Sequence, residues 1–185
     1  MLYLIGGAPR AGKSILGQQL ATQLQLSWIS TDLLVQVLKA KDVAGAPTQW
    51  DASPAAITKK AEWFFPCLER FVWGAQSLAD GYIIEGVDFL PGQVVQLATH
   101  YPLRSIFLGC EKMTLDRFDR FPGRSRGYAA LPEEMRRQFA QDVPRWSTFV
   151  RQETTRFGVP YLDMSDNFQA RLQEAIVLIT GDGCS

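Results

Sequence analysis

Eight residues near the start of the chain have the types and spacing of a phosphate-binding loop. The segment from Gly7 to Ser14 reads GAPRAGKS and satisfies the pattern G-x-x-x-x-G-K-[ST]. Glycines let consecutive backbone N–H groups point at one phosphate, and the following helix N-terminus adds unpaired donors and partial positive charge. Lys13 would then reach the β- and γ-phosphates, and the Ser14 hydroxyl would coordinate Mg²⁺. We expect a nucleoside triphosphate to be bound by Gly7, Ala8, Pro9, Arg10, Ala11, Gly12, Lys13, Ser14 and Ile15.

Two acidic residues follow short apolar segments that we expect to be strands. Asp32 follows the second such segment, and Glu85 ends the third. Because the carboxyl ends of parallel strands gather at one edge of a sheet, both carboxylates should face the phosphate loop. There Asp32 can orient or deprotonate an acceptor hydroxyl, or join Ser14 in binding Mg²⁺, and Glu85 can hold the metal's water or the nucleophile. Asp32 can alternatively cap the next helix, a role that Thr31 also fits. Asp88 is a further acidic candidate near Glu85.

Four arginines lie in or beside a segment with the composition of a mobile loop, residues 119–131. We expect a lid over residues 117–131 whose arginines close over the triphosphate and neutralise charge on the transferred phosphoryl group. The alternative is a solubilising surface loop in which Asp116 and Asp119 pair with these arginines. The side chains expected to act in catalysis are Lys13, Asp32, Glu85, Arg117, Arg120 and Arg124, and Arg126 belongs to the same segment.

Short apolar segments alternate with amphipathic ones along the chain. Strands are expected over residues 1–5, 27–30, 82–85 and 103–108, with a fifth after residue 160 that runs through residue 164. Helices are expected over residues 12–26, 31–41, 53–80, 91–100, 111–118, 132–157 and 167–180, with a kink near Pro66 and a break at Pro144. This alternation predicts an α/β fold, a parallel sheet with helices on both faces, in a single domain of residues 1–185.

Aromatic residues are dense between residues 50 and 75. Most of them fit the buried face of the helix expected there. Trp50 instead belongs to residues 42–53, whose composition predicts a loop, so that it can stack on a substrate.

Composition excludes several classes of protein. Hydrophobic residues make up 46% of the 185, as in an ordinary folded domain, and the longest apolar runs are about five residues against the roughly 20 of a membrane span. The net charge is zero, which gives no overall signature of nucleic-acid binding. Three scattered cysteines argue against a disulfide framework or a zinc site. Without an export signal, a cytoplasmic protein is expected.

Together these segments resemble the small P-loop kinases, the nucleoside-monophosphate-kinase-like group that includes adenylate, shikimate and gluconate kinases. The resemblance implies a three-layer αβα P-loop NTPase fold with a five-stranded parallel sheet in the order 2-3-1-4-5. It also implies a helical substrate-binding insert at residues 33–80 and a closing lid. The matching segments are Gly7–Ser14 for the phosphate loop, Thr31-Asp32 and Glu85-Gly86 for the acids after strands, Arg117–Arg126 for the lid, and Tyr161–Asp166 for the last strand and adenine-side loop.

The chain departs from two members of that group in informative ways. Ile29–Asp32 and Ile83–Val87 are similar to segments of 2-phosphoglycerate kinases, but Asp88 stands where a histidine commonly follows. The D-G-F-P-R segment of adenylate kinase is also missing, and with it an arginine that grips an acceptor phosphate. A small hydroxylated metabolite or drug-like alcohol is therefore expected as the acceptor rather than a nucleoside monophosphate.

The sequence thus predicts an ATP-dependent, Mg²⁺-requiring phosphotransferase that acts on a hydroxyl of a small molecule. Its partners would be a nucleoside triphosphate and that acceptor, without nucleic acid or membrane, in a monomer or homodimer. The alternative is a nucleotide-hydrolysing switch that acts on a protein partner. A third reading, a binding module without catalysis, is disfavoured because both Lys13 and Ser14 are present.

Overall fold

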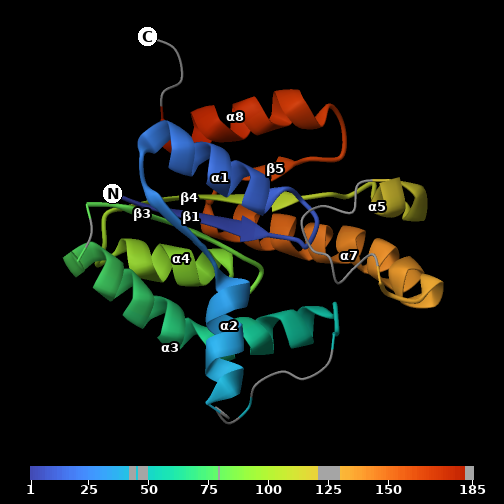
Figure 1. Cartoon of the computed structure of the whole chain (residues 1–185), viewed down its shortest axis with the longest axis horizontal. Coiled ribbons are helices and arrows are strands. Elements are labelled where there is room, and N and C mark those ends of the chain that lie inside the picture. The colour runs from blue at the N-terminus through green and yellow to red at the C-terminus, as the bar shows by residue number, and fades with distance from the viewer. Residues whose placement is uncertain (42–44, 46–49, 79, 121–129, 182–185) are drawn as a thin grey trace.

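The computed structural model describes residues 1–41, 45, 50–78, 80–120 and 130–181 of the chain, and each strand there is separated from the next by one or two helices (Figure 1). The strands are β1 (Leu2–Gly7), β2 (Ser27–Ser30), β3 (Tyr82–Glu85), β4 (Leu103–Gly109) and β5 (Tyr161–Asp163). The helices are α1 (Lys13–Leu24), α2 (Thr31–Ala40), α3 (Pro54–Leu78), α4 (Pro91–Ala98), α5 (Leu115–Arg120), α7 (Glu133–Phe157) and α8 (Phe168–Thr180).

All five strands form one parallel sheet in the order β2-β3-β1-β4-β5. In the register of the central strand, Leu4 lies opposite Ile84 of β3 and Ser105 of β4. The predicted fold class and strand order are therefore confirmed. Strand β1 is the central strand, paired with β3 on one side and β4 on the other, so the phosphate loop that follows it lies at the middle of the sheet edge.

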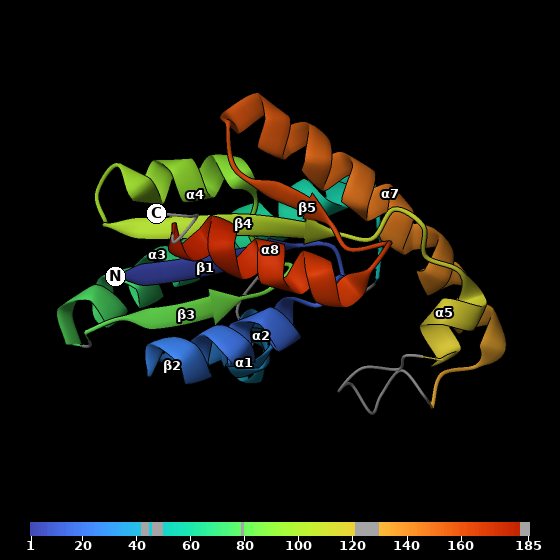
Figure 2. The ribbon, with the colours of Figure 1, turned by 90° about the horizontal axis from the view of Figure 1, so that it is seen from above.

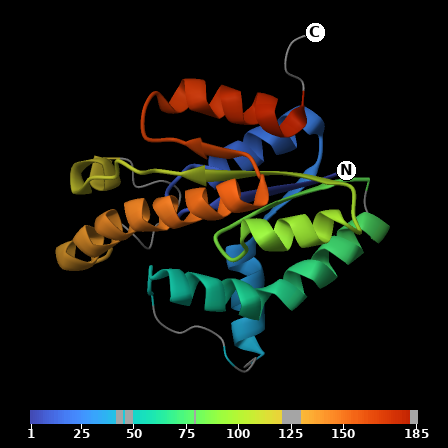
Figure 3. The ribbon, with the colours of Figure 1, turned by 180° about the vertical axis from the view of Figure 1, so that it is seen from behind.

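Helices cover both faces of this sheet (Figures 1 and 3). Helices α1 and α8 lie on one face, and α3, α4 and α7 lie on the other. The core between the layers is made by strand residues buried on both sides, such as Leu4, Ile84 and Phe107, none of which has any exposed surface. This two-sided burial explains the continuous apolar character of the strands. No helix in the described part of the chain is both long enough and apolar enough to cross a bilayer.

The carboxyl ends of the strands point toward the side of the molecule where α5 lies (Figure 2). The segment Gly7–Ser14 follows β1, α2 begins directly after β2, and Glu85 ends β3 at the same edge. Parallel strands with ligand-binding loops at this edge form the usual crevice of open α/β sheets. The phosphate loop, Asp32 and Glu85 are therefore brought to one edge by the topology.

The first strand is longer than the sequence pattern predicted. It continues through Gly6 and Gly7, which lie opposite Phe107 and Leu108 of β4. A Cβ atom at Gly6 would lie 2.2 Å from the Phe107 ring, so the glycine is needed for this close approach. The expectation that the strand ends at Ile5 was wrong because the two glycines act as packing residues as well as loop residues.

The expected break at Pro144 was also wrong, because α7 is one continuous helix across it. Proline removes a helical hydrogen bond and crowds the preceding turn, at a cost of about 3 kcal/mol. The flanking residues Val143, Trp146 and Ser147 are all buried, so packing of this helix face against the sheet offsets that cost. Pro66 likewise lies inside α3, whose two halves run in different directions as predicted (Figure 3).

Candidate active site

The phosphate loop is built from glycines in conformations that other residues rarely adopt. Gly7 has φ +125° and Gly12 has φ +92°. The N–H of Ala8 donates to the carbonyl of Leu108 at 2.8 Å, which fixes the loop to the end of β4. Gly12 is the N-cap of α1 and packs against Phe168, whose ring would lie 2.7 Å from a Cβ at this position. The loop therefore leads directly into a helix N-terminus that suits an anion.

Lys13 is the first residue of α1 and is only 6% exposed. Its ammonium group donates to the carbonyl of Ala8 at 2.7 Å, so the side chain folds back along the loop. Burial lowers the pKa of Lys13, and the carboxylates of Glu85, Asp32 and Asp88 act in the opposite direction. A buried ammonium group surrounded by carboxylates can bind a phosphate as a further anionic partner at little additional desolvation cost.

Ser14 lies next to Glu85. The Ser14 hydroxyl donates to Glu85 Oε1 at 3.0 Å. Burial raises the pKa of Glu85, whereas Lys13 and the hydroxyls of Ser30 and Ser14 favour its charged form. Hydroxyl and carboxylate oxygens are the donors that Mg²⁺ prefers, and it is commonly held by one or two of them together with substrate phosphates. Among the described residues no cluster of three His, Cys, Asp or Glu forms a metal cage. The pair thus fits Mg²⁺ bound with a nucleotide.

Asp32 lies in the first turn of α2 and is not the N-cap of this helix. Ser30 is the N-cap, and its hydroxyl accepts from the N–H of Asp32 at 3.4 Å. The pKa of Asp32 is raised, first by its partial withdrawal from water and then by the nearby Asp88 carboxylate, while Lys13 and Lys60 oppose the rise. The Asp32 carboxylate is therefore within electrostatic reach of the phosphate loop, as required of a group that acts on an acceptor hydroxyl.

An ion pair between a buried carboxylate and a partly exposed lysine lies near Asp32. Asp88 has no exposed surface, accepts a 2.5 Å hydrogen bond from the Thr31 hydroxyl, and pairs with the Lys60 ammonium of α3 at 2.6 Å. A Cβ at Gly86 would lie 1.7 Å from the Thr31 oxygen, so this approach depends on the glycine. The sequence analysis named Asp88 but missed Lys60 and considered Thr31 only as a cap. Nothing in local spacing could have linked a lysine on α3 to them.

Arg117 of α5 contacts the loop that follows β5. Its guanidinium donates to the carbonyl of Met164 at 3.0 Å and also to the carbonyl of Ser165. Arg120 lies at the end of the same helix and is exposed. Asp119, an ion-pair partner in the surface-loop alternative, pairs with Arg136 of α7 at 2.6 Å. Arg124, Arg126 and most of the expected lid lie outside the described residues.

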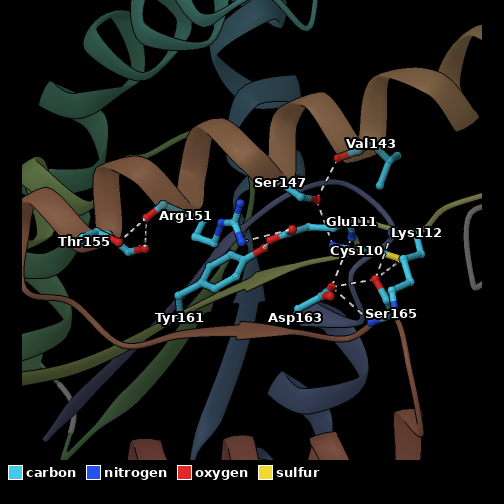
Figure 4. A network of polar contacts seen from close by, with 11 residues as sticks. Cys110, Glu111, Lys112, Val143, Ser147, Arg151, Thr155, Tyr161, Asp163 and Ser165 are labelled. Atoms are coloured by element: carbon cyan, nitrogen blue, oxygen red, sulfur yellow. Dashed lines mark hydrogen bonds and ion pairs between the residues drawn. The ribbon is translucent and has the colours of Figure 1, made fainter.

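Helix α5 begins at Leu115, four residues later than predicted. The backbone N–H groups of the preceding turn are hydrogen-bonded to side chains of a polar network (Figure 4). Asp163 Oδ1 accepts from the N–H of Glu111 at 3.1 Å and from the Ser165 hydroxyl at 2.6 Å. The Ser165 hydroxyl oxygen in turn accepts from the N–H of Lys112 at 2.9 Å. These long-range bonds hold residues 111 and 112 in a turn and tie the end of β4 to the loop after β5.

The same network extends to α7, as Figure 4 shows. The Tyr161 hydroxyl donates to Glu111 at 2.9 Å, and Arg151 pairs with the other oxygen of that carboxylate at 3.3 Å. Burial and the Glu111 carboxylate raise the pKa of Tyr161, which therefore stays a neutral donor. The backbone N–H of Cys110 donates a hydrogen bond to Ser147 Oγ at 2.8 Å. The carboxyl ends of β4 and β5 are thus tied to α7 by side-chain contacts.

Trp50 is half-buried and lines a cavity that residues 50–54 form with α7. Its indole N–H donates to the buried Asp142 carboxylate at 2.8 Å. Its ring stacks on Trp146 at 5.2 Å between centroids and tilts against Phe139 at 4.6 Å. Long-range contacts with α7 hold the indole ring in place, and its substrate-stacking role stays a prediction.

Comparison with solved structures finds proteins of similar fold. A shikimate kinase from Bacteroides thetaiotaomicron has 12% identity and a TM-score of 0.58, with 97% of this chain and 98% of that chain covered. The chain has the fold of the small P-loop kinases. A shikimate kinase from Acinetobacter baumannii in complex with shikimate has 15% identity and a TM-score of 0.56, covering 100% of this chain and 95% of that one.

A gluconokinase from Sinorhizobium meliloti 1021 is similar at 15% identity and a TM-score of 0.55, with 97% of this chain and 91% of that chain covered. The sequence matches no protein-family model, and comparison with curated proteins finds no match. At these identities the likeness concerns the fold. The roles of individual residues in this P-loop kinase fold have to be argued from the site itself.

Proposed function

We propose that this protein is an ATP-dependent, Mg²⁺-requiring phosphotransferase that moves the γ-phosphoryl group of ATP to a hydroxyl of a small molecule. The observation that carries the proposal is the grouping of a buried ammonium, a hydroxyl–carboxylate pair and a second carboxylate at one edge of the sheet. Lys13 donates to the loop at 2.7 Å, Ser14 donates to Glu85 at 3.0 Å, and Asp32 lies within electrostatic reach of Lys13.

Each side chain has a separate task in this proposal. Lys13 and the loop amides bind the β- and γ-phosphates and stabilise the charge that develops on them. Ser14 and Glu85 would hold Mg²⁺, which neutralises charge on the phosphate oxygens when it is bound. Asp32 lies at the same edge and is proposed to contact Mg²⁺ through water.

Asp32 is the group proposed to act on the acceptor. The acceptor oxygen attacks the γ-phosphorus, the bond from that phosphorus to the β,γ-bridging oxygen breaks, and ADP leaves with the bond's electron pair. The hydroxyl proton passes to the Asp32 carboxylate. A raised pKa makes Asp32 a better proton acceptor than an ordinary aspartate, provided that it is ionised at the working pH.

Two observations, one on the segment after β3 and one on the fold, support the proposed acceptor class. Gly86 is followed by Val87 and by Asp88, which is engaged by Thr31 and Lys60, so the arginine of adenylate kinase that would grip an acceptor phosphate is replaced. The structurally similar proteins include a shikimate kinase bound to shikimate and a gluconokinase. Both observations favour a small polyhydroxylated acceptor.

A screen of hydroxylated small molecules tests the proposal. Purified protein with ATP and Mg²⁺ should release ADP at about 1–100 per second with a suitable acceptor, and ³¹P NMR should find the phosphoryl group on that acceptor. The Asp32→Asn variant is the matched control, because it keeps the shape and removes the base. ADP release without any phosphorylated acceptor, stimulated instead by a protein, would favour the alternative of a nucleotide-driven switch.

A further inference from the structure

Arg10, the fourth residue of the phosphate loop, has a left-handed backbone with φ +63°. Among the described residues only two other non-glycine positions have positive φ, and both lie at helix ends: Gln25 is the C-cap of α1 and Asn167 the N-cap of α8. Such a conformation is unfavourable for a residue with a Cβ and persists where surrounding contacts enforce it. The contacts of the Arg10 side chain can therefore explain why this position holds an arginine.

The Arg10 side chain crosses from the phosphate loop to α5. Its guanidinium carbon lies 4.6 Å from the centre of the Phe118 ring, and its Nη2 donates to the Phe118 carbonyl at 3.1 Å. One planar guanidinium thus stacks on a ring and binds the backbone of the same residue, which an ammonium group cannot do in this way. The contact joins segments 108 residues apart in the sequence.

Phe118 is itself fixed on its other sides. It is 2% exposed and packs with Phe139 of α7, with the two rings nearly parallel at 9° and 6.5 Å apart. Together with Ala140 these residues form a small core separate from the main one, against which Trp50 also packs. A movement of Phe118 therefore moves α5 as a body, including Arg117 and Arg120 on either side of it.

We propose that Arg10 is a positioning residue that couples phosphate binding in the loop to the placement of α5 and its arginines. The inference rests on the proposed function, since it concerns the same nucleotide site. A phosphate bound by the loop amides fixes the direction of the Arg10 backbone, and that direction determines whether the guanidinium can reach Phe118. Occupation of the loop then stabilises the contact with Phe118, and with it the placement of α5 and its arginines.

Coupling of this kind is reciprocal, so it can be measured from both sides. The first readout is hydrogen exchange of the amides of residues 115–120 with and without a non-hydrolysable ATP analogue and Mg²⁺. The second is the dissociation constant of that analogue. The variants are Arg10→Gly, Arg10→Lys and Phe118→Leu, and the matched control is Arg70→Ala, which removes a guanidinium 4.0 Å from the Trp73 ring on α3.

In the wild type the analogue should slow exchange in α5 by about 10-fold, within the usual range for coupled sites. Arg10→Gly and Arg10→Lys should both abolish this protection and weaken analogue binding by up to the same factor, and Phe118→Leu should reduce both. A variant that combines Arg10→Gly with Phe118→Leu should bind no more weakly than Arg10→Gly alone. Arg70→Ala should behave as the wild type. Because Arg10→Gly relieves the left-handed backbone, loss of folding does not obscure the result.

Two results would overturn the inference while leaving the proposed function intact. One is full protection of α5 by the analogue in Arg10→Gly. The other is wild-type binding and protection in Arg10→Lys, which would mean that Arg10 acts through its charge on the phosphates rather than through Phe118. If the wild-type protein binds no nucleotide at all, the proposed function itself fails and this inference fails with it.

Discussion

The Ser14 hydroxyl donates to Glu85 Oε1 at 3.0 Å, although the two residues are 71 positions apart. This bond joins the first turn of α1 to the end of β3 across the phosphate loop. It presents two hard oxygen donors side by side at the edge where the strands end. The pair also explains how a carboxylate at the end of β3 can contribute to a site at the phosphate loop that follows β1.

Ser14→Ala should weaken the dependence of nucleotide binding on Mg²⁺. Loss of a metal-binding or supporting oxygen typically costs 10–100-fold in metal affinity, so the Mg²⁺ concentration for half-maximal effect should rise by about 10-fold or more. The measurement is a Mg²⁺ titration of ATP binding at a fixed ATP concentration. Ser77→Ala is the control, because the Ser77 hydroxyl bonds only within α3 at the carbonyl of Trp73 among the contacts described for it. An unchanged Mg²⁺ requirement in Ser14→Ala would remove this serine from the metal site.

As the pH is lowered, activity should be lost at a higher pH than expected for a catalytic aspartate with an ordinary pKa. The reactive form of Asp32 is the carboxylate, and its pKa is raised by withdrawal from water and by Asp88, against the effects of Lys13 and Lys60. As pH falls, protonation therefore begins above the ordinary value of about 3.9. The acid limb of kcat/KM against pH reports this group in the free enzyme.

Substitutions at the neighbouring ion pair should move that acid limb in opposite directions. Asp88→Asn removes a negative neighbour, so the pKa of Asp32 falls and activity persists to lower pH. Lys60→Met removes a positive neighbour, so the limb moves to higher pH. An NMR titration of the Asp32 carboxyl measures the same shifts without an acceptor. Shifts in the same direction, or none, would contradict the assignment of Asp32 as the base.

Gly86→Ala should destabilise the protein and displace Asp32. The added methyl group would lie 1.7 Å from the Thr31 oxygen and 2.7 Å from its Cβ, forcing α2 away from β3. Overpacking of this kind costs about 1–3 kcal/mol in the free energy of unfolding, measured by urea denaturation. Gly74→Ala is the control, since nothing lies within 4 Å of a Cβ there and alanine favours a helix by about 0.5–1 kcal/mol. Equal stability of the two variants would show that the approach of Thr31 to Gly86 is not required.

Much of the fold could be predicted because its signals are local. The phosphate loop is a contiguous motif between a strand and a helix, and the five strands are short apolar segments separated by amphipathic ones. Strand order came from the resemblance to small P-loop kinases, because periodicity alone does not determine which strands pair. The positions of Asp32 and Glu85 at one edge then followed from the parallel topology.

The errors have a common physical cause in contacts between distant parts of the chain. Helix α5 begins late because Asp163 and Ser165 capture the turn before it. Helix α7 continues through Pro144 because its flanks are buried. The contacts of Trp50 with Asp142 and Trp146 of α7 are also long-range and could not be predicted from local spacing. The Lys60–Asp88 pair was missed for the same reason.

Calorimetric titration of wild-type protein and of Lys13→Met with MgATP tests the central claim most directly. The substitution keeps the buried stem of the side chain and removes the ammonium, so the unfolding curve should be little changed. We predict saturable binding by the wild type that is weakened by about 10-fold or more in the variant, as expected for lost charged hydrogen bonds. Absence of binding by the wild type, or equal affinity in Lys13→Met, would contradict the account.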